Sequence, residues 1–122
     1  MTKGIGIDIE SIDRIDSLVA RYDAHVLRLI YTEGELQRCR CSGEPARQFA
    51  ICFVAKEAMS KALGTGFATI DWCEIEVHVR DNEITLSLYG KALERATSLS
   101  VTGWKTHWSQ HDNHIIVQVV IY

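Results

Sequence analysis

Isoleucine alternates with small or acidic residues near the start of the chain, and this period of two predicts a β-strand over residues 3–10. One face of the strand carries Ile5, Ile7 and Ile9. The opposite face carries Gly4, Gly6, Asp8 and Glu10. The glycines leave room above that face for a ligand or another stretch of backbone to approach closely.

The two acidic residues of this strand need a partner. Asp8 and Glu10 lie two positions apart on one face, and like charges so close repel each other unless a cation or solvent lies between them. The pattern is therefore consistent either with the solvent-facing end of an edge strand or with a cation site.

Residues 12–29 have apolar positions at helical spacing, and Ser11 is placed to cap this helix. The predicted buried face comprises Ile15, Leu18, Val19, Tyr22, Val26 and Leu29. A neighbouring flank carries Arg14, Arg21 and Arg28, one every seven residues. In a chain with a net charge of −3, this basic ridge is either a solvated face or a dock for an acidic partner helix.

The longest helical pattern spans residues 46–66, and its apolar face ends in two charged residues. At about 100° per residue, that face carries Ala50, Phe53, Val54, Glu57 and Lys61. The last two could form an ordinary surface pair worth about 0.2–0.5 kcal/mol. Alternatively, Glu57 points to a metal and Lys61 to a phosphate, since both ligands need a rigid platform with little water.

Gly64 and Gly66 close this helix and could bring backbone N–H groups near a phosphate, although glycine ends many helices. The other elements predicted are a short helix from Thr32 to Cys39 with a capping box, a hairpin of residues 72–80 and 83–89, a helix over 90–99, and strands over 101–108 and 114–122. This order predicts an α+β fold, with a mainly antiparallel sheet packed on a long central helix.

Composition narrows the function classes. The chain has 122 residues, 47% of them hydrophobic, which predicts a single domain over residues 1–122. Its net charge of −3 argues against a general nucleic-acid binder. No signal peptide or membrane-spanning stretch is recognisable, so we expect a cytoplasmic protein with its four cysteines as free thiols. The short spacing of Cys39 and Cys41 disfavours zinc.

Several motifs occur in a familiar order. GIDIE at residues 6–10 is followed by Arg14, by Phe53-Val-Ala-Lys-Glu-Ala58 with Lys61, by Leu63-Gly-Thr-Gly66, and by L-x-L-x-G-x-A at residues 86–92. This order resembles the 4′-phosphopantetheinyl transferases, specifically the small holo-acyl-carrier-protein synthase type. The signatures of that type are a G-x-D strand and a [FW]-x-x-K-E-[AS]-x-x-K helix. The similarity extends over nearly the whole chain.

The resemblance implies an enzyme that moves the phosphopantetheine arm of coenzyme A to a serine of an apo acyl or peptidyl carrier protein and releases adenosine 3′,5′-bisphosphate. Asp8 and Glu57 would hold Mg²⁺ against the coenzyme A diphosphate, and Lys61 would pair with a phosphate oxygen. These roles suit phosphoryl transfer, which needs a hard cation, a positive clamp and a base. Glu57 or a water on the metal is the candidate base.

The same resemblance assigns further residues. Arg14 and Arg21 match the family's docking helix for the acidic carrier protein, and Arg28 extends their ridge. The glycine loop and His111 would contact coenzyme A, with the metal-bound water as another partner for His111. A chain this short implies a homotrimer with sites between subunits. The sequence leaves open whether the carrier serves fatty-acid, polyketide or other synthesis.

Three departures from the family pattern matter. Glu10 arrives one position earlier than the usual glutamate, as in the larger two-lobed relatives, so we expect it to be a third metal ligand, direct or through water. Cys52 stands where arginine is common. The motif Ser-x-Ser-His is reduced to Trp108-Ser-Gln-His111. An alternative function is therefore a coenzyme A-binding or carrier-binding module with impaired catalysis.

Overall fold

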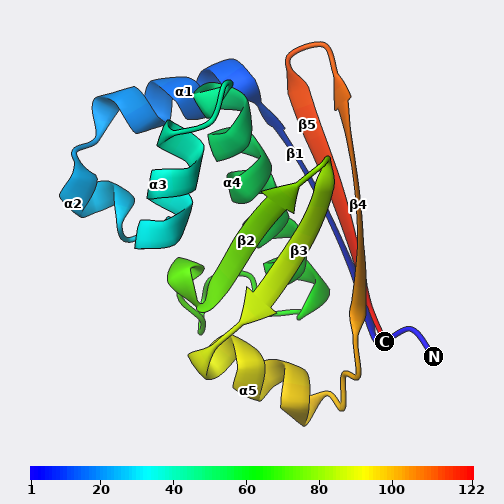
Figure 1. Ribbon diagram of the computed structural model, residues 1–122. Coiled ribbons are helices and arrows are strands. Elements are labelled where there is room, and N and C mark those ends of the chain that lie inside the picture. The colour runs from blue at the N-terminus through cyan, green and yellow to red at the C-terminus, as the bar shows by residue number, and fades with distance from the viewer.

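The longest helix packs across one face of an antiparallel sheet (Figure 1). In the computed structural model, which describes residues 1–122, this helix is α4 (Pro45–Ala62). The strands of the sheet, in spatial order, are β1 (Gly4–Ser11), β5 (His114–Ile121) and β4 (Trp104–His111). A separate hairpin consists of β2 (Ile75–Arg80) and β3 (Glu83–Leu88). The α+β class is confirmed, but the strands form two sheets.

The other helices lie at the two ends of α4. Figure 1 shows three of them near its beginning and one below the β2–β3 hairpin. They are α1 (Ile12–Arg21), α2 (Ala24–Leu27), α3 (Glu33–Arg40) and α5 (Gly90–Ser98). A short 3₁₀ helix, Trp72–Glu74, leads into β2. No helix is both long and apolar enough to span a membrane.

Close contact between β1 and α4 depends on two glycines. A β-carbon on Gly4 would lie 2.1 Å from the carbonyl oxygen of Ala62, and one on Gly6 would lie 1.8 Å from that of Ala58. No side chain fits at either distance. The space predicted above these glycines is therefore filled by the backbone of α4, which places the charged residues of α4 beside β1.

The three-stranded sheet buries one face and exposes the other. The face toward α4 contains the fully buried residues Ile115, Val117, Val119 and Ile121 of β5. On the outer face, Ile5, Ile7 and Ile9 are 56%, 54% and 53% exposed. The register places Ile116 and Val120 beside them, opposite Ile9 and Ile5. We refer to these five residues as the outer apolar face.

The helix predicted over residues 12–29 is broken, so this prediction is wrong in its second half. Tyr22 is extended, and Asp23 Oδ1 accepts a hydrogen bond of 3.0 Å from the backbone N of Val26. An aspartate in this position caps a new helix, α2. Tyr22 and Leu29, which we predicted to be buried, are therefore 42% and 66% exposed.

Predictions based on local capping and turn residues agree with the structure better than the helix predicted over residues 12–29 does. Thr32 and Glu35 form the predicted capping box, with hydrogen bonds of 3.1 and 2.7 Å. The β2–β3 hairpin turns at Asp81 and Asn82, which both have positive φ, as two-residue hairpin loops require. Strand β4 begins three residues later than predicted and runs as far as His111.

Candidate functional site

Asp8 and Lys61 meet where β1 crosses the end of α4. Lys61 Nζ lies 2.9 Å from Asp8 Oδ1 and also donates to the backbone oxygen of Ile7 at 3.4 Å. The other carboxylate oxygen, Asp8 Oδ2, is buried and has no hydrogen-bond partner. A buried oxygen without a partner is energetically costly and marks a position that a ligand can satisfy. Asp8 thus presents an unused acceptor beside a fixed cation.

Glu57 adds a second carboxylate one helical turn before Lys61. It is half-buried, and burial, followed by the negative charge of Asp8, raises the pKa of Glu57. The positive charge of Lys61 lowers the pKa of Glu57. The hydrogen bond that Lys61 donates to Asp8 in turn raises the pKa of Lys61. The three residues therefore form one electrostatic unit with two acidic groups and one amine.

Glu10, the third predicted metal ligand, has a partner of its own. Its Oε2 lies 2.5 Å from Arg14 Nη1, and its Oε1 accepts from the backbone N of Ser11 at 3.4 Å. No group of three His, Cys, Asp or Glu side chains is close enough to hold a metal by itself. Asp8 and Glu57 still offer the carboxylate oxygens that Mg²⁺ prefers, and Mg²⁺ usually completes its shell with water and substrate phosphate. The donor set fits that ion.

The N–H groups of the glycine loop after α4 form hydrogen bonds with the last carbonyls of that helix. Gly64 and Gly66 have φ of +80° and +54°, and their N–H groups donate to the carbonyls of Lys61 (3.0 Å) and Ser60 (3.1 Å). Arg95 of α5 holds the same turn by donating to the Leu63 carbonyl at 2.9 Å. These bonds satisfy the backbone carbonyl groups in the last turn of α4. Contact of the two glycines with a phosphate remains a prediction.

His111 is not near the acidic site within one chain. It is exposed at the end of β4 and lies opposite His114, which in turn lies opposite Ser11 of β1. The alternation of the strands places this row on the face of the sheet opposite Asp8. A contact between His111 and the acidic site therefore requires another copy of the chain.

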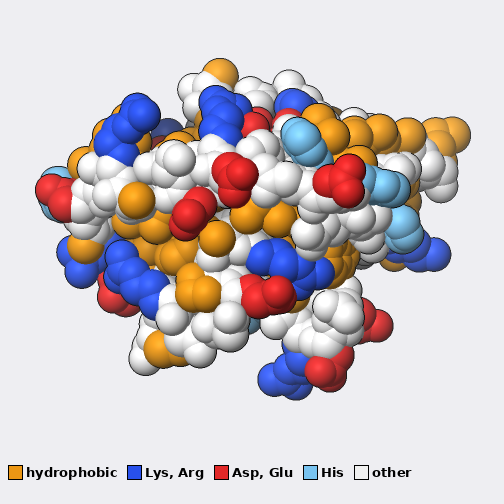
Figure 2. All heavy atoms as spheres, turned by 90° about the horizontal axis from the view of Figure 1, so that it is seen from above, with side chains coloured by type: hydrophobic (Ala, Val, Ile, Leu, Met, Phe, Trp, Pro, Cys, Tyr) orange, Lys and Arg blue, Asp and Glu red, His pale blue; other side chains and the backbone are white.

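The basic ridge is divided by the break between α1 and α2. Arg14 and Arg21 border a hollow of about 410 Å³ that Ser17, Leu18 and Tyr22 complete. Arg28 lies beyond the break and forms an ion pair of 3.0 Å with Glu33. Figure 2, seen from above, shows blue basic groups over the side where α1 and α2 lie and pale blue histidines toward the β4–β5 turn.

A buried ion pair that includes Lys56 of the helix motif was not predicted from the sequence. Lys56 and Glu35 are both fully buried, with 2.8 Å between Nζ and Oε1. Lys56 also donates to the carbonyls of Trp72 and Ile75 (2.9 and 2.6 Å), and Glu35 Oε2 accepts from the backbone N of Val77 at 2.6 Å. The pair joins α3, α4 and β2 and fixes the rotation of α4. The sequence signal for a buried lysine was the apolar run from Phe49 to Ala55, which continues directly into Lys56.

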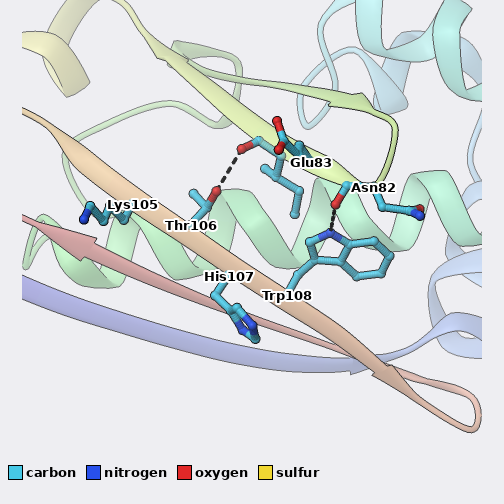
Figure 3. A pocket seen from close by; sticks show the side chains of 7 residues that line it. Asn82, Glu83, Lys105, Thr106, His107 and Trp108 are labelled. Atoms are coloured by element: carbon cyan, nitrogen blue, oxygen red, sulfur yellow. Dashed lines mark hydrogen bonds between the residues drawn. The ribbon is translucent and has the colours of Figure 1, made fainter.

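A second unpredicted cluster lies where the two sheets meet (Figure 3). Trp108 Nε1 donates to the carbonyl of Asn82 at 2.6 Å, and Thr106 Oγ1 donates to that of Ile84 at 2.8 Å. Arg47 lies 4.9 Å from the centre of the Trp108 ring and donates to Gln110 at 2.6 Å. The adjoining cavity of about 510 Å³ is lined by β3 and β4.

Comparisons with known proteins agree on one family. Residues 4–119 match the family described as the 4′-phosphopantetheinyl transferase superfamily. The holo-[acyl-carrier-protein] synthase of Herpetosiphon aurantiacus is 36% identical over 123 residues, which cover 94% of each chain.

Solved structures show the same similarity. The crystal structure of holo-[acyl-carrier-protein] synthase from Neisseria meningitidis superposes with a TM-score of 0.86 and 28% identity, covering 100% of this chain and 99% of the other. The enzyme from Helicobacter pylori, solved in complex with coenzyme A, has a TM-score of 0.80 and 27% identity, covering 97% and 99%.

Proposed function

Because the chain belongs to the 4′-phosphopantetheinyl transferase superfamily, we propose that it transfers the 4′-phosphopantetheine group of coenzyme A to a serine of an apo acyl carrier protein. The observation that carries this proposal is the unit of Asp8, Glu57 and Lys61, with the unpartnered Asp8 Oδ2 at its centre. Relatives named holo-[acyl-carrier-protein] synthase and a relative bound to coenzyme A support the substrate pair.

The chemistry of this reaction assigns each group a task. The serine hydroxyl oxygen attacks the phosphorus that carries the pantetheine arm, and the bond to adenosine 3′,5′-bisphosphate breaks. Asp8 and Glu57 would hold Mg²⁺, which when bound neutralises the diphosphate. Lys61 is 48% exposed at its side chain while paired to Asp8, so it can also donate to a phosphate oxygen. Glu57, with its raised pKa, is a suitable acceptor for the serine proton.

The outer apolar face supports a homotrimer with shared sites. Three isoleucines of one strand, each more than half exposed, are unusual on a surface that meets only water. Their burial against other copies would remove this apolar area from water. Assembly would also provide the only route by which the face carrying His111 reaches the acidic site of another chain.

The carrier protein would dock at the hollow on α1. Arg14 and Arg21 supply positive charge at its edges, and Leu18 and Tyr22 supply apolar contact between them. This arrangement fits an acidic helix with a hydrophobic side. Arg28 lies outside the hollow and would contribute through longer-range attraction.

Intact-mass spectrometry of an apo acyl carrier protein tests the proposal. The carrier is incubated with this protein, coenzyme A and Mg²⁺, with and without a chelator. We expect a gain of one phosphopantetheine that the chelator abolishes. If carriers from fatty-acid and polyketide systems all remain unmodified while calorimetry shows coenzyme A binding, the protein is a binding module without catalysis, and the proposal is wrong.

A further inference from the structure

Two buried cysteines face each other between α3 and α4. Cys39 Sγ and Cys52 Sγ are 3.8 Å apart, in contact as a thiol–thiol hydrogen bond. Their residues are 3% and 2% exposed. Neither takes part in the site described above. The two thiols are thus a separate chemical feature of the fold.

A small cavity connects this pair to the outside. It measures about 170 Å³, and both cysteines line it together with the polar residues Arg38, Ser42 and Gln48. Arg38 is partly exposed at its side chain, 44%, so the cavity has a charged mouth and a sulfur-lined interior. A reagent of a few atoms can therefore reach both thiols without unfolding of the helices.

We propose that Cys39 and Cys52 are an oxidisable dithiol, which closes to a disulfide when a hydroperoxide enters this cavity. The peroxide oxidises one thiol to a sulfenic acid and releases one water. The second thiol displaces the sulfenic oxygen as another water, and the S–S bond forms. Two thiol hydrogens and two electrons thus reduce one hydrogen peroxide to two waters.

The location gives the disulfide a structural consequence. Cys39 follows Glu35 by one helical turn on α3, and Cys52 precedes Lys56 by one turn on α4. The bond would add a covalent link directly beside the buried ion pair. It closes a loop between residues thirteen positions apart, and such a loop restricts the unfolded chain. The oxidised protein should therefore unfold at a higher temperature.

The environment also sets the expected speed of reaction. The hydrogen bond with Cys39 and burial raise the pKa of Cys52 well above its ordinary value. Because the thiolate is the reactive form, oxidation should be slow at neutral pH and several-fold faster at alkaline pH.

Peptide mapping of the whole protein tests the proposal. Reduced protein is treated with hydrogen peroxide in the presence of a chelator, alkylated and digested with trypsin, which cleaves after Arg38, Arg40 and Arg47. Cys39 and Cys41 then lie on different peptides. We expect loss of two alkylatable thiols, a peptide 39–40 linked to peptide 48–56, and an increased melting temperature that a reductant reverses.

Matched variants separate this pair from the other thiols. Cys41→Ser should retain the linkage, whereas Cys52→Ala should abolish it. Should Cys52→Ala fail to fold, the map of the wild-type protein alone decides. Linkage through Cys41 or Cys73, or oxidation of those two while Cys39 and Cys52 remain free thiols, would overturn the proposal.

Discussion

At the scale of single residues, Glu57 combines a functional role with an energetic penalty. The folded protein holds a proton on Glu57 more tightly than the unfolded chain does, because burial and Asp8 raise its pKa. Its ionisation therefore lowers stability as the pH rises from the ordinary glutamate pKa through the raised one. The loss is complete only above the raised pKa.

Replacement of Glu57 should remove that penalty. We expect Glu57→Gln to melt at or above the wild-type temperature at neutral pH while losing transfer activity, with the difference between the proteins disappearing in acid. Circular dichroism melts across pH measure this, and Glu94→Gln on the exposed side of α5 is the control. A variant that melts lower than wild type at neutral pH would show that Glu57 stabilises the fold.

At the scale of elements, the ion pair between α3 and α4 sets the orientation of α4. Glu35 and Lys56 are both fully buried, and removal of one partner leaves an uncompensated charge. We expect Glu35→Ala to lower the free energy of unfolding by about 3–5 kcal/mol. Urea denaturation measures the loss.

A surface pair provides the comparison for this measurement. Glu33→Ala breaks an exposed ion pair with Arg28 and should cost less than about 1 kcal/mol. The double variant Glu35→Leu with Lys56→Met should be more stable than Glu35→Ala, since no charge is then left buried. Equal losses in Glu35→Ala and Glu33→Ala would contradict the role assigned to the buried pair.

The packing of β1 on α4 is a second feature of this scale. Gly6→Ala places a β-carbon 1.8 Å from the Ala58 carbonyl oxygen, so the helix must move away from the strand. We expect a loss of about 1–3 kcal/mol or more and weaker transfer, because Asp8 and Lys61 separate. Gly43→Ala, which meets no atom within 4 Å, should leave both unchanged. A stable, fully active Gly6→Ala would disprove the close contact.

At the scale of the whole molecule, the outer apolar face is the surface through which we propose that copies of the chain assemble. Ile7→Lys places a charge at the middle of this face, where burial against another copy would be strongly unfavourable. We expect the variant to sediment as a monomer while wild type sediments as a trimer, and to lose transfer activity. Leu93→Lys, at an exposed leucine of α5, should not alter assembly. A wild-type monomer with full activity would refute shared sites.

The sequence predicted features that depend on local chemistry. The capping box at Thr32 and Glu35 and the hairpin turn at Asp81 and Asn82 follow from residue types at short spacing. The unit of Asp8, Glu57 and Lys61 is different, because β1 and α4 lie far apart in sequence and only the resemblance to a known family brought their motifs together.

Features that depend on three-dimensional packing were not predictable. The break after Tyr22 was missed because apolar periodicity continues through it, although Asp23 caps a new helix there by accepting a hydrogen bond from the backbone N of Val26. The ion pair of Glu10 with Arg14, four residues later on α1, was not foreseen, and a role of Glu10 as a third metal ligand stays a prediction. The outer apolar face could not be recognised, because an alternating pattern does not say which face meets solvent.

We propose that Asp8 and Glu57 act together in group transfer, and the transfer rates of folded variants distinguish this role from a purely structural one. Phosphopantetheine transfer to an apo carrier protein is followed by intact mass for wild type, Asp8→Asn, Glu57→Gln and the control Glu94→Gln, each shown to be folded. We predict that both site variants lose at least about a hundredfold in rate and that the control does not. Transfer at the wild-type rate by either folded site variant would contradict the account.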